Sequence, residues 1–310
     1  MDNIVKFSFP GLGIKGGEVS KIAFGSVAWY GVVIALGMLM AIAYASYRCK
    51  QHGIKVDDLI DIAIFTIFFG VIGARLYYVA FNPSGFKTFK DVIAIWNGGL
   101  AIYGGIIAGA ITVVIVCLIK KLNWRKLFDA VGPGVMLAQA MGRWGNFFNG
   151  EAYGAIVEEG HPLYFLRMGL ISDNTRLDFA TNEMVYVHPC FLYESLWNIF
   201  GFILINLVYK KKKFDGQIAL YYFAWYGFGR MFIEGLRTDA LYIGNSGIRV
   251  SQLLGFLLFA AGTALIIYGL IYVKKHPDSK LAIANNAPAI EGVSEDEEES
   301  EDEVDETENG

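Results

Sequence analysis

The sequence predicts an all-α, multi-pass membrane protein with about seven transmembrane helices. Of its 310 residues, 55% are hydrophobic and only 18% are charged, and the mean hydropathy is +0.42. This composition is too apolar for an ordinary soluble domain. Apolar stretches of roughly 20 residues, the length that crosses a bilayer as a helix, recur along the chain.

Seven such stretches follow one another. They begin near Ala23, Leu59, Gly99, Leu127, Cys190, Gln217 and Ser251. The first is too long for a removable signal peptide and has no small-residue cleavage pattern after it, so we expect it to remain attached. The fourth and sixth are the weakest because they contain glycine, proline and charged residues. We expect a transmembrane domain at 23–275, preceded by an extracytoplasmic segment at 1–22.

Basic residues indicate the side of the membrane on which each loop lies. Every second loop is basic, with Arg48, Lys50, Lys55, Lys120, Lys121, Arg125, Lys126, Lys210, Lys211, Lys212, Lys213, Lys274 and Lys275. The positive-inside rule places these loops in the cytoplasm, the amino terminus outside and the carboxyl terminus inside. The long segment at about 154–187 then lies outside, where it is the only candidate for a small extramembrane subdomain.

The charge of the chain is unevenly divided. Twelve of the 30 acidic residues follow Lys280, so 18 acidic residues face 26 basic ones in the rest of the chain, a formal charge of +8. A basic membrane-embedded body suits anionic lipid. Residues 276–310 are poor in aromatic residues and dense in Glu and Asp, which predicts a disordered cytoplasmic tail without a catalytic part. Cys49, Cys117 and Cys190 have neither metal-ligand spacing nor a disulfide pattern.

The densest group of polar residues follows the fourth stretch. Residues 141–154 read Met-Gly-Arg-Trp-Gly-Asn-Phe-Phe-Asn-Gly-Glu-Ala-Tyr-Gly, and their polar side chains are Arg143, Asn146, Asn149 and Glu151. The interspersed glycines let the backbone bend and approach a ligand, while the side chains supply donors and one carboxylate. This combination predicts a binding site at the outer end of the fourth helix.

Two other charged residues lie within apolar surroundings. Charge inside a membrane is costly and is by default a functional hypothesis. Arg75 lies toward the outer end of the second helix, where it is either functional or an arginine that reaches for the headgroups. Asp129 opens the fourth helix, where we favour a structural role as a helix cap near the inner face.

A second charged group lies late in the sixth stretch, at residues 226–239. On a helix, Arg230, Glu234 and Arg237 share one face, and the first two form an i,i+4 pair. An internal ion pair that fixes helix packing explains Arg230 with Glu234. It leaves Arg237 and Arg143 without an anion, and a phosphate fits both because guanidinium groups bind it in a bidentate manner.

Two further segments open helices at the same predicted depth. Residues 96–105 place Tyr103 among small residues at the start of the third helix, and His188, Tyr193 and Glu194 open the fifth. Aromatic residues at a membrane interface are usually belt residues, so neither segment is specific alone. Together with the two charged groups, they predict that four helices converge on one cationic pocket at the outer side.

These residues resemble the prolipoprotein diacylglyceryl transferases of bacteria. The run from Gly142 to Gly154 is similar to the signature of that family. Supporting matches are the Gly-Ala-Arg-Leu-Tyr-Tyr run at Arg75, the Trp-Asn-Gly-Gly run before Tyr103, the segment from His188 to Glu194, and the segment from Gly229 to Arg237. The resemblance covers about residues 25–273 and leaves out the acidic tail.

The resemblance implies a reaction at the outer leaflet of the bacterial plasma membrane. The family moves the diacylglyceryl group of phosphatidylglycerol to the lipobox cysteine of a prolipoprotein and releases glycerol phosphate, the first step of lipoprotein maturation. It implies no metal, no cofactor and no nucleic-acid partner. By analogy, Arg143 and Arg237 hold the phosphate, Arg230 with Glu234 fixes the sixth helix, and Asn146 and Glu151 position the headgroup or the peptide. Tyr30 and Gly154 also match substrate-binding positions, with Asn149, His188, Tyr193 and Glu194 as secondary candidates and Arg75 as a structural residue.

The general base is the point at which the sequence departs from the family. Many members carry a His where this chain has Tyr103. A neutral tyrosine with an unperturbed pKa near 10 is a poor base for a thiol. Tyr103 is therefore a base with a lowered pKa or only orients the substrate through its hydroxyl. Glu151 is the second candidate for the base, and Tyr30 is a third.

Two other functions are compatible with the pattern. A secondary transporter also places glycine-broken helices and buried charges in the membrane, but it usually has paired halves, which this sequence lacks. A lipid-binding protein, or an enzyme that uses phosphatidylglycerol for another acceptor, needs the same arginine pocket. Dependence on a lipobox cysteine distinguishes the diacylglyceryl transferase from both.

Overall fold

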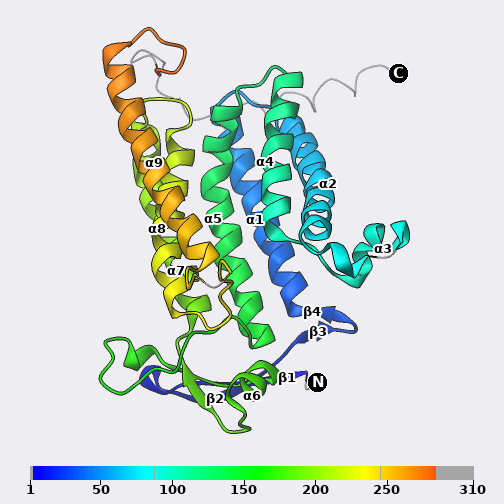
Figure 1. Cartoon of the computed structure of the whole chain (residues 1–310). Coiled ribbons are helices and arrows are strands. Elements are labelled where there is room, and N and C mark those ends of the chain that lie inside the picture. The colour runs from blue at the N-terminus through cyan, green and yellow to red at the C-terminus, as the bar shows by residue number, and fades with distance from the viewer. Residues whose placement is uncertain (1–2, 87, 245, 284–310) are drawn as a thin grey trace, which may run out of the picture.

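Seven long helices standing side by side form the body of the molecule (Figure 1). The computed structural model describes residues 3–86, 88–244 and 246–283. Within these residues the long helices are α1 (Trp29–Gln51), α2 (Val56–Phe81), α4 (Ile102–Ile119), α5 (Trp124–Asn149), α7 (Cys190–Val208), α8 (Gln217–Leu236) and α9 (Val250–Lys275). Their first residues lie close to the predicted ones, except for α1.

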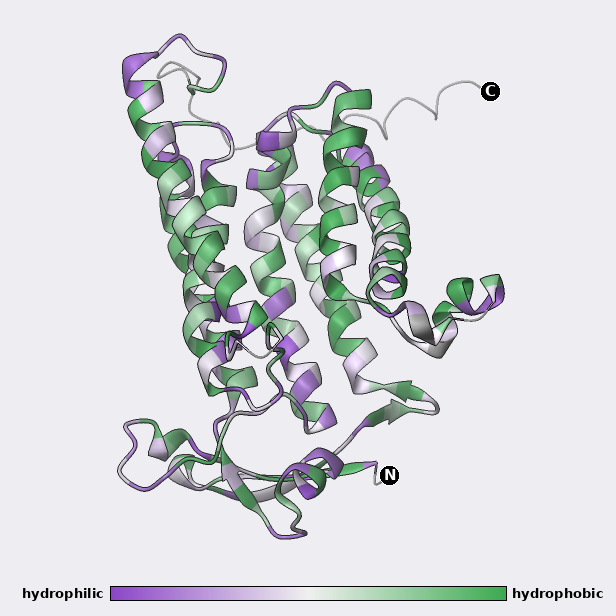
Figure 2. Ribbon diagram, in the orientation of Figure 1, coloured by the Kyte–Doolittle hydropathy of each residue, from purple (hydrophilic) through white to green (hydrophobic). Residues whose placement is uncertain are grey.

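Five of these helices are long and apolar enough to cross a membrane: α1, α2, α4, α7 and α9. α5 and α8 are the same two that the sequence marks as weakest. Many apolar side chains on the outside of the bundle are exposed, such as Leu39 at 62%, Ile64 at 60% and Leu257 at 52%. Figure 2 shows that hydrophobic residues extend along most of the length of the helices. Because water disfavours so large an apolar surface, this is a multi-pass membrane protein.

A β-sheet lies at one end of the bundle (Figure 1), so the prediction of an all-α chain is wrong. β1 (Ile4–Phe9), β2 (Ile14–Ser20), β5 (Met168–Ile171) and β6 (Val185–Val187) pair antiparallel in the order β2-β1-β5-β6. In this sheet Lys6 lies opposite Ile171. The amino-terminal segment and the segment at 154–187 therefore form one subdomain, which also contains α6 (Asp173–Phe179).

A second, two-stranded sheet joins this subdomain to the bundle. β3 (Ile22–Phe24) and β4 (Val27–Ala28) form a short hairpin immediately before α1. The first helix therefore begins at Trp29 rather than near Ala23, because the residues before it form the hairpin of β3 and β4.

An apolar core fixes the sheet to the ends of two helices. Val5 and Leu170 of the sheet pack with Phe147 near the end of α5 and Phe191 at the start of α7, and all four are nearly inaccessible. Burial of side chains of this size stabilises by about 1.5 to 3 kcal/mol each. The core thereby orients the end of α5, where the 141–154 segment lies.

Asp129 caps a helix, but a neighbouring one. Its carboxylate accepts hydrogen bonds from the backbone N–H groups of Gly216 and Ala219 at the start of α8, at 2.9 and 3.0 Å, and pairs with Lys212 at 2.8 Å. α5 itself begins after Asn123, whose side chain accepts from the N–H of Arg125. Since Asp129 is fully buried, this contact fixes α5 against α8 at the end opposite the sheet.

The end of the described chain adds to the same region. The N–H of Asp215 donates to Leu281 O at 3.2 Å, and that of Ile283 donates to Lys213 O at 3.0 Å. Residues 276–283, which the sequence places in the acidic tail, thus pack beside the loop between α7 and α8. The predicted disorder of 284–310 falls outside the described residues.

Candidate active site

A sharp turn at the end of α5 shapes the first part of the site. Gly150 caps the helix in the left-handed region with φ of 63°, and a Cβ there would lie 2.6 Å from Ser172 Cβ. Only glycine fits both constraints. The turn brings the side chain of Glu151 back against the last turns of α5. There its carboxylate accepts hydrogen bonds from Asn146 Nδ2 at 3.1 Å and Asn149 Nδ2 at 3.3 Å.

Glu194 is the centre of the charged site. This residue of α7 is 4% exposed, and its carboxylate contacts three guanidinium groups, one from α5, one from α8 and one from Arg237, the residue that follows the end of α8. Arg143 lies at 2.7 Å, Arg230 at 2.8 Å and Arg237 at 3.4 Å. Arg230 also forms the predicted i,i+4 ion pair with Glu234, at 2.5 Å. The sequence ranks Glu194 only as a secondary candidate, whereas the structure makes it the common partner of all three arginines.

Asp239 completes the set of charges. Its two carboxylate oxygens bind Nε and Nη2 of Arg237 at 2.9 and 2.7 Å. The expectation that Arg143 and Arg237 lack an anion within the protein is therefore wrong, because Glu194 serves the first, and Glu194 and Asp239 serve the second. Three guanidinium groups face three carboxylates, so the ion-paired cluster is neutral as it stands.

Asn146 connects the two parts of the site. Its amide oxygen accepts from Arg143 Nη1 at 3.3 Å, while its amide nitrogen donates to Glu151. A continuous chain of polar contacts thus runs from Glu151 through Asn146 and Arg143 to Glu194. Glu151 has no ion-pair partner among the described residues, which distinguishes it from the other carboxylates of the site.

The backbone beside Arg237 is held by the chain that follows the turn. Gly154 and Arg237 form an antiparallel bridge, and the N–H of Ala155 donates to Leu236 O at 2.9 Å. A Cβ on Gly154 would lie 2.7 Å from His188 Cβ and 2.8 Å from Leu236 O. A larger residue at position 154 would therefore clash with the neighbouring chain segments, which pass close to Gly154.

His188 and Tyr193 lie beside this bridge. His188 exchanges backbone hydrogen bonds with Gly154 and Ala155, and its Nδ1 lies 3.2 Å from the Tyr193 hydroxyl. Burial, together with the nearby His161, lowers the pKa of His188. The imidazole is therefore neutral at neutral pH, and its described contacts support the backbone under the arginine cluster.

Two tyrosines border the charged cluster. Tyr30 of α1 packs on the 141–154 segment, since a Cβ on Gly145 would lie 2.7 Å from its ring. The Tyr103 hydroxyl lies 3.1 Å from Ser251 Oγ at the start of α9. Arg249, two residues before Ser251, donates to the backbone oxygens of Glu234 and Arg237, so Tyr103 is linked to the cluster through the start of α9.

Arg75 has a structural role outside the cluster. Its guanidinium group donates to the backbone carbonyls of Asp91, Val92, Gly98 and Gly99 at 2.6 to 2.9 Å. It is 7% exposed and therefore holds the segment with α3 (Phe89–Ile93) instead of reaching for headgroups.

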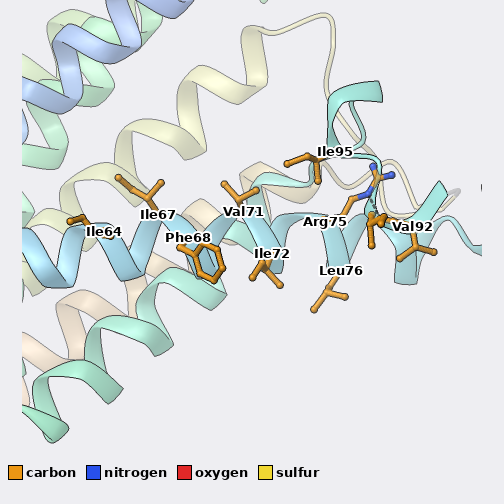
Figure 3. A pocket seen from close by; sticks show the side chains of 10 residues that line it. Ile64, Ile67, Phe68, Val71, Ile72, Arg75, Leu76, Val92 and Ile95 are labelled. Atoms are coloured by element: carbon orange, nitrogen blue, oxygen red, sulfur yellow. Dashed lines mark hydrogen bonds between the residues drawn. The ribbon is translucent and has the colours of Figure 1, made fainter. Parts of the chain in front are cut away.

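Figure 3 shows Arg75 at one end of an apolar groove on α2. The groove has a volume of about 680 Å³ and is lined by Ile64, Ile67, Phe68, Val71, Ile72, Leu76, Val92, Ile93 and Ile95 as well as Arg75.

Sequence reasoning missed three contributors to the site. Asp239 closes the 226–239 segment but stands two residues beyond Arg237, past the end of the helix, so helical spacing gives it no role. Arg249 and Ser251 lie at the start of α9, where the sequence contains no recognisable motif. Arg249 Nη1 donates to the backbone oxygens of Glu234 and of Arg237, the latter at 3.0 Å.

No group of His, Cys, Asp and Glu suited to a metal ion occurs in the part of the chain that the structure describes.

The fold and this site define a multi-pass membrane protein in which a buried arginine–carboxylate cluster lies at the sheet end of the helix bundle. The model of the family described as prolipoprotein diacylglyceryl transferase matches residues 19–268. The chain belongs to this family.

Two similar relatives are both named phosphatidylglycerol–prolipoprotein diacylglyceryl transferase. The relative from Streptococcus agalactiae serotype Ia is 42% identical over 250 residues, which are 78% of this chain and 91% of that protein. The relative from Staphylococcus aureus strain Newman is 40% identical over 262 residues, which are 83% of this chain and 91% of that protein. The resemblance found in the sequence is thereby confirmed.

Proposed function

We propose that this protein transfers the diacylglyceryl group of phosphatidylglycerol to the lipobox cysteine of prolipoproteins. In this reaction the cysteine sulfur attacks the glyceryl carbon that bears the phosphate. A C–S bond forms, the C–O bond breaks, the electron pair leaves with glycerol phosphate, and a base takes the thiol proton. The observation that carries the proposal is the arginine cluster around Glu194, in a chain of this family.

The arginines suit the charge that develops in this reaction. Negative charge grows on the phosphate oxygen as the C–O bond breaks, and fixed guanidinium groups in a water-poor site stabilise it. Arg230 is held by both Glu194 and Glu234, which supports a structural role. The side chain of Arg143 is the most exposed of the three, at 23% against 13% for Arg230 and 10% for Arg237. This exposure supports Arg143 as a residue that a phosphate can reach.

Glu151 is the best supported general base. It lies in the same contact network as Arg143 but is bound only by two neutral amides. Because no guanidinium is paired with Glu151 among the described residues, uptake of a proton by this carboxylate leaves no cation of the site without its counterion. The Tyr103 hydroxyl is engaged with Ser251, which supports an orienting role for Tyr103.

The membrane orientation follows from charge. We propose that all seven long helices cross the bacterial plasma membrane, with the sheet outside and the carboxyl terminus in the cytoplasm. The basic loops support this, since Lys120, Lys126 and Lys212 lie at or near the helix ends opposite the sheet (Figure 1) and positive loops stay inside. The charged cluster then faces the outer leaflet.

The test is incubation of the purified protein with phosphatidylglycerol and a lipobox peptide. A parallel incubation uses the same peptide with its cysteine replaced by serine. We expect a gain of one diacylglyceryl mass on the cysteine peptide alone, with equimolar glycerol phosphate. Arg143→Ala and Arg237→Ala should abolish transfer. Modification of the serine peptide would contradict the lipobox requirement, and full activity of a folded Arg143→Ala protein would contradict the phosphate assignment.

A further inference from the structure

Asp239 occupies the edge of the Arg237 guanidinium group through which an anionic headgroup could bind in a bidentate manner. Its carboxylate binds Nε and Nη2 in parallel, at 2.9 and 2.7 Å. This fork is the arrangement through which guanidinium groups also bind phosphate. The remaining nitrogen, Nη1, faces Glu194 at 3.4 Å. A phosphate that binds Arg237 through the fork therefore meets a carboxylate already in place.

Asp239 is also the one acid of the cluster that stands at the surface. Its side chain is 49% exposed, whereas those of Glu194 and Glu234 are 5% and 2% exposed. Glu194 and Glu234 are fixed on helices, while Asp239 follows the end of α8 at Leu236. The Asp239 carboxylate therefore already borders the surface, whereas those of the two glutamates are enclosed by protein.

The charges of the cluster give a reason for such a movement. Partial burial raises the pKa of Asp239, but the hydrogen bonds and charge of Arg237 outweigh it, so that the pKa lies below its ordinary value. The carboxylate is thus ionised at neutral pH. Because Arg143, Arg230 and Arg237 are already paired with three acids, a phosphate that enters the fork of Arg237 brings its negative charge within a few ångströms of the Asp239 carboxylate. Like charges at such distances repel strongly where water is scarce.

We propose that Asp239 is a displaceable counterion, which occupies the guanidinium fork of Arg237 when no lipid is bound and leaves it when the phosphate of an anionic lipid enters. This proposal rests on the proposed role of Arg237 in phosphate binding. In the empty protein, Asp239 keeps Arg237 charge-balanced and oriented. Its displacement lowers the net affinity for the lipid, so Asp239 sets how tightly the anionic headgroup is held.

The first test measures the affinity of the full chain for short-chain phosphatidylglycerol in detergent micelles. Asp239→Asn keeps the shape of the side chain and removes its charge, so we expect the dissociation constant to fall on the order of fivefold, the factor that corresponds to one partly exposed ion pair. Asp239→Glu retains the charge and should stay close to the wild type. Glu18→Gln is the matched control, because Glu18 forms an exposed pair with Lys6 in the sheet.

A second test uses the unmodified protein and so does not depend on a variant that folds. Carbodiimide labelling of carboxyl groups is followed by mass spectrometry, with phosphatidylglycerol or phosphatidylcholine added. We expect labelling of Asp239 to rise with phosphatidylglycerol only, while that of Glu18 stays constant. Unchanged or reduced labelling of Asp239, or weaker lipid binding by Asp239→Asn, would overturn the proposal. Both measurements report binding, so a wild type that fails to modify the peptide refutes the transferase function without deciding the role of Asp239.

Discussion

Removal of the charge on Glu194 should destabilise the whole site. Its two carboxylate oxygens contact Arg143, Arg230 and Arg237 at 2.7, 2.8 and 3.4 Å in a buried position. Glu194→Gln keeps the volume and one oxygen acceptor, but its amide group now faces a guanidinium. Glu234 and Asp239 are then the two carboxylates that remain in the ion-paired cluster, against three arginines.

The magnitude follows from the burial of the cluster. Removal of one partner from a buried ion pair costs about 3 to 5 kcal/mol, because the remaining charge has neither water nor a counterion. Since proteins are stable by only about 5 to 15 kcal/mol in total, we expect the midpoint of thermal unfolding to fall by roughly 6 to 20 °C. Transfer activity should be lost as well, because Arg143 and Arg237 lose the group that orients them.

Thermal unfolding in detergent, followed by tryptophan fluorescence, measures the first effect. The double variant Glu194→Gln with Arg143→Gln should be less destabilised than the sum of the two single variants, because it removes a cation together with its partner. A Glu194→Gln protein with the melting temperature of the wild type would refute the central position of Glu194. Strictly additive effects of the two substitutions would refute the direct coupling of the pair.

Three further results are expected. Glu151→Gln should lose transfer activity without a fall in melting temperature, because Glu151 holds no cation, while Tyr103→Phe retains more activity; the reverse order in the peptide assay would make Tyr103 the base. Burial and nearby positive charges lower the pKa of His52 from 6.5 to about 4. As the pH drops from 6.5 toward 4, the imidazole of the unfolded chain is therefore protonated before that of the folded chain, and the stability of the folded chain decreases. His52→Gln should flatten that part of the pH dependence of the melting temperature, and an unchanged slope would assign it to other groups. Truncation after Ile283 should leave activity intact, whereas truncation after Lys275 removes the contacts to the loop at 213–215 and should lower stability; an inactive but folded chain ending at Ile283 would give the acidic tail a part in the reaction.

The helices were predictable because their signal is local. Apolar runs of bilayer length mark them, and α7 and α8 begin at the predicted residues, Cys190 and Gln217. The sheet was not predictable in the same way. β1 pairs with β2, its neighbour in the sequence, but it also pairs with β5, where Lys6 lies opposite Ile171. This second pairing, which builds the four-stranded sheet, joins segments that lie far apart in the sequence.

The same distinction governs the charges of the site. The pair Arg230 and Glu234 lies within one helix, so spacing alone predicts it. Arg143 and Glu194 come from different helices and meet only in the folded bundle. A count of charges along single helices therefore leaves arginines unpaired and overestimates the positive charge of the pocket. With Glu194 and Asp239 included, the cluster is balanced before any ligand binds. An anionic lipid that binds through Arg237 therefore meets a carboxylate, and the exposed Asp239 is better placed to move away than the buried Glu194.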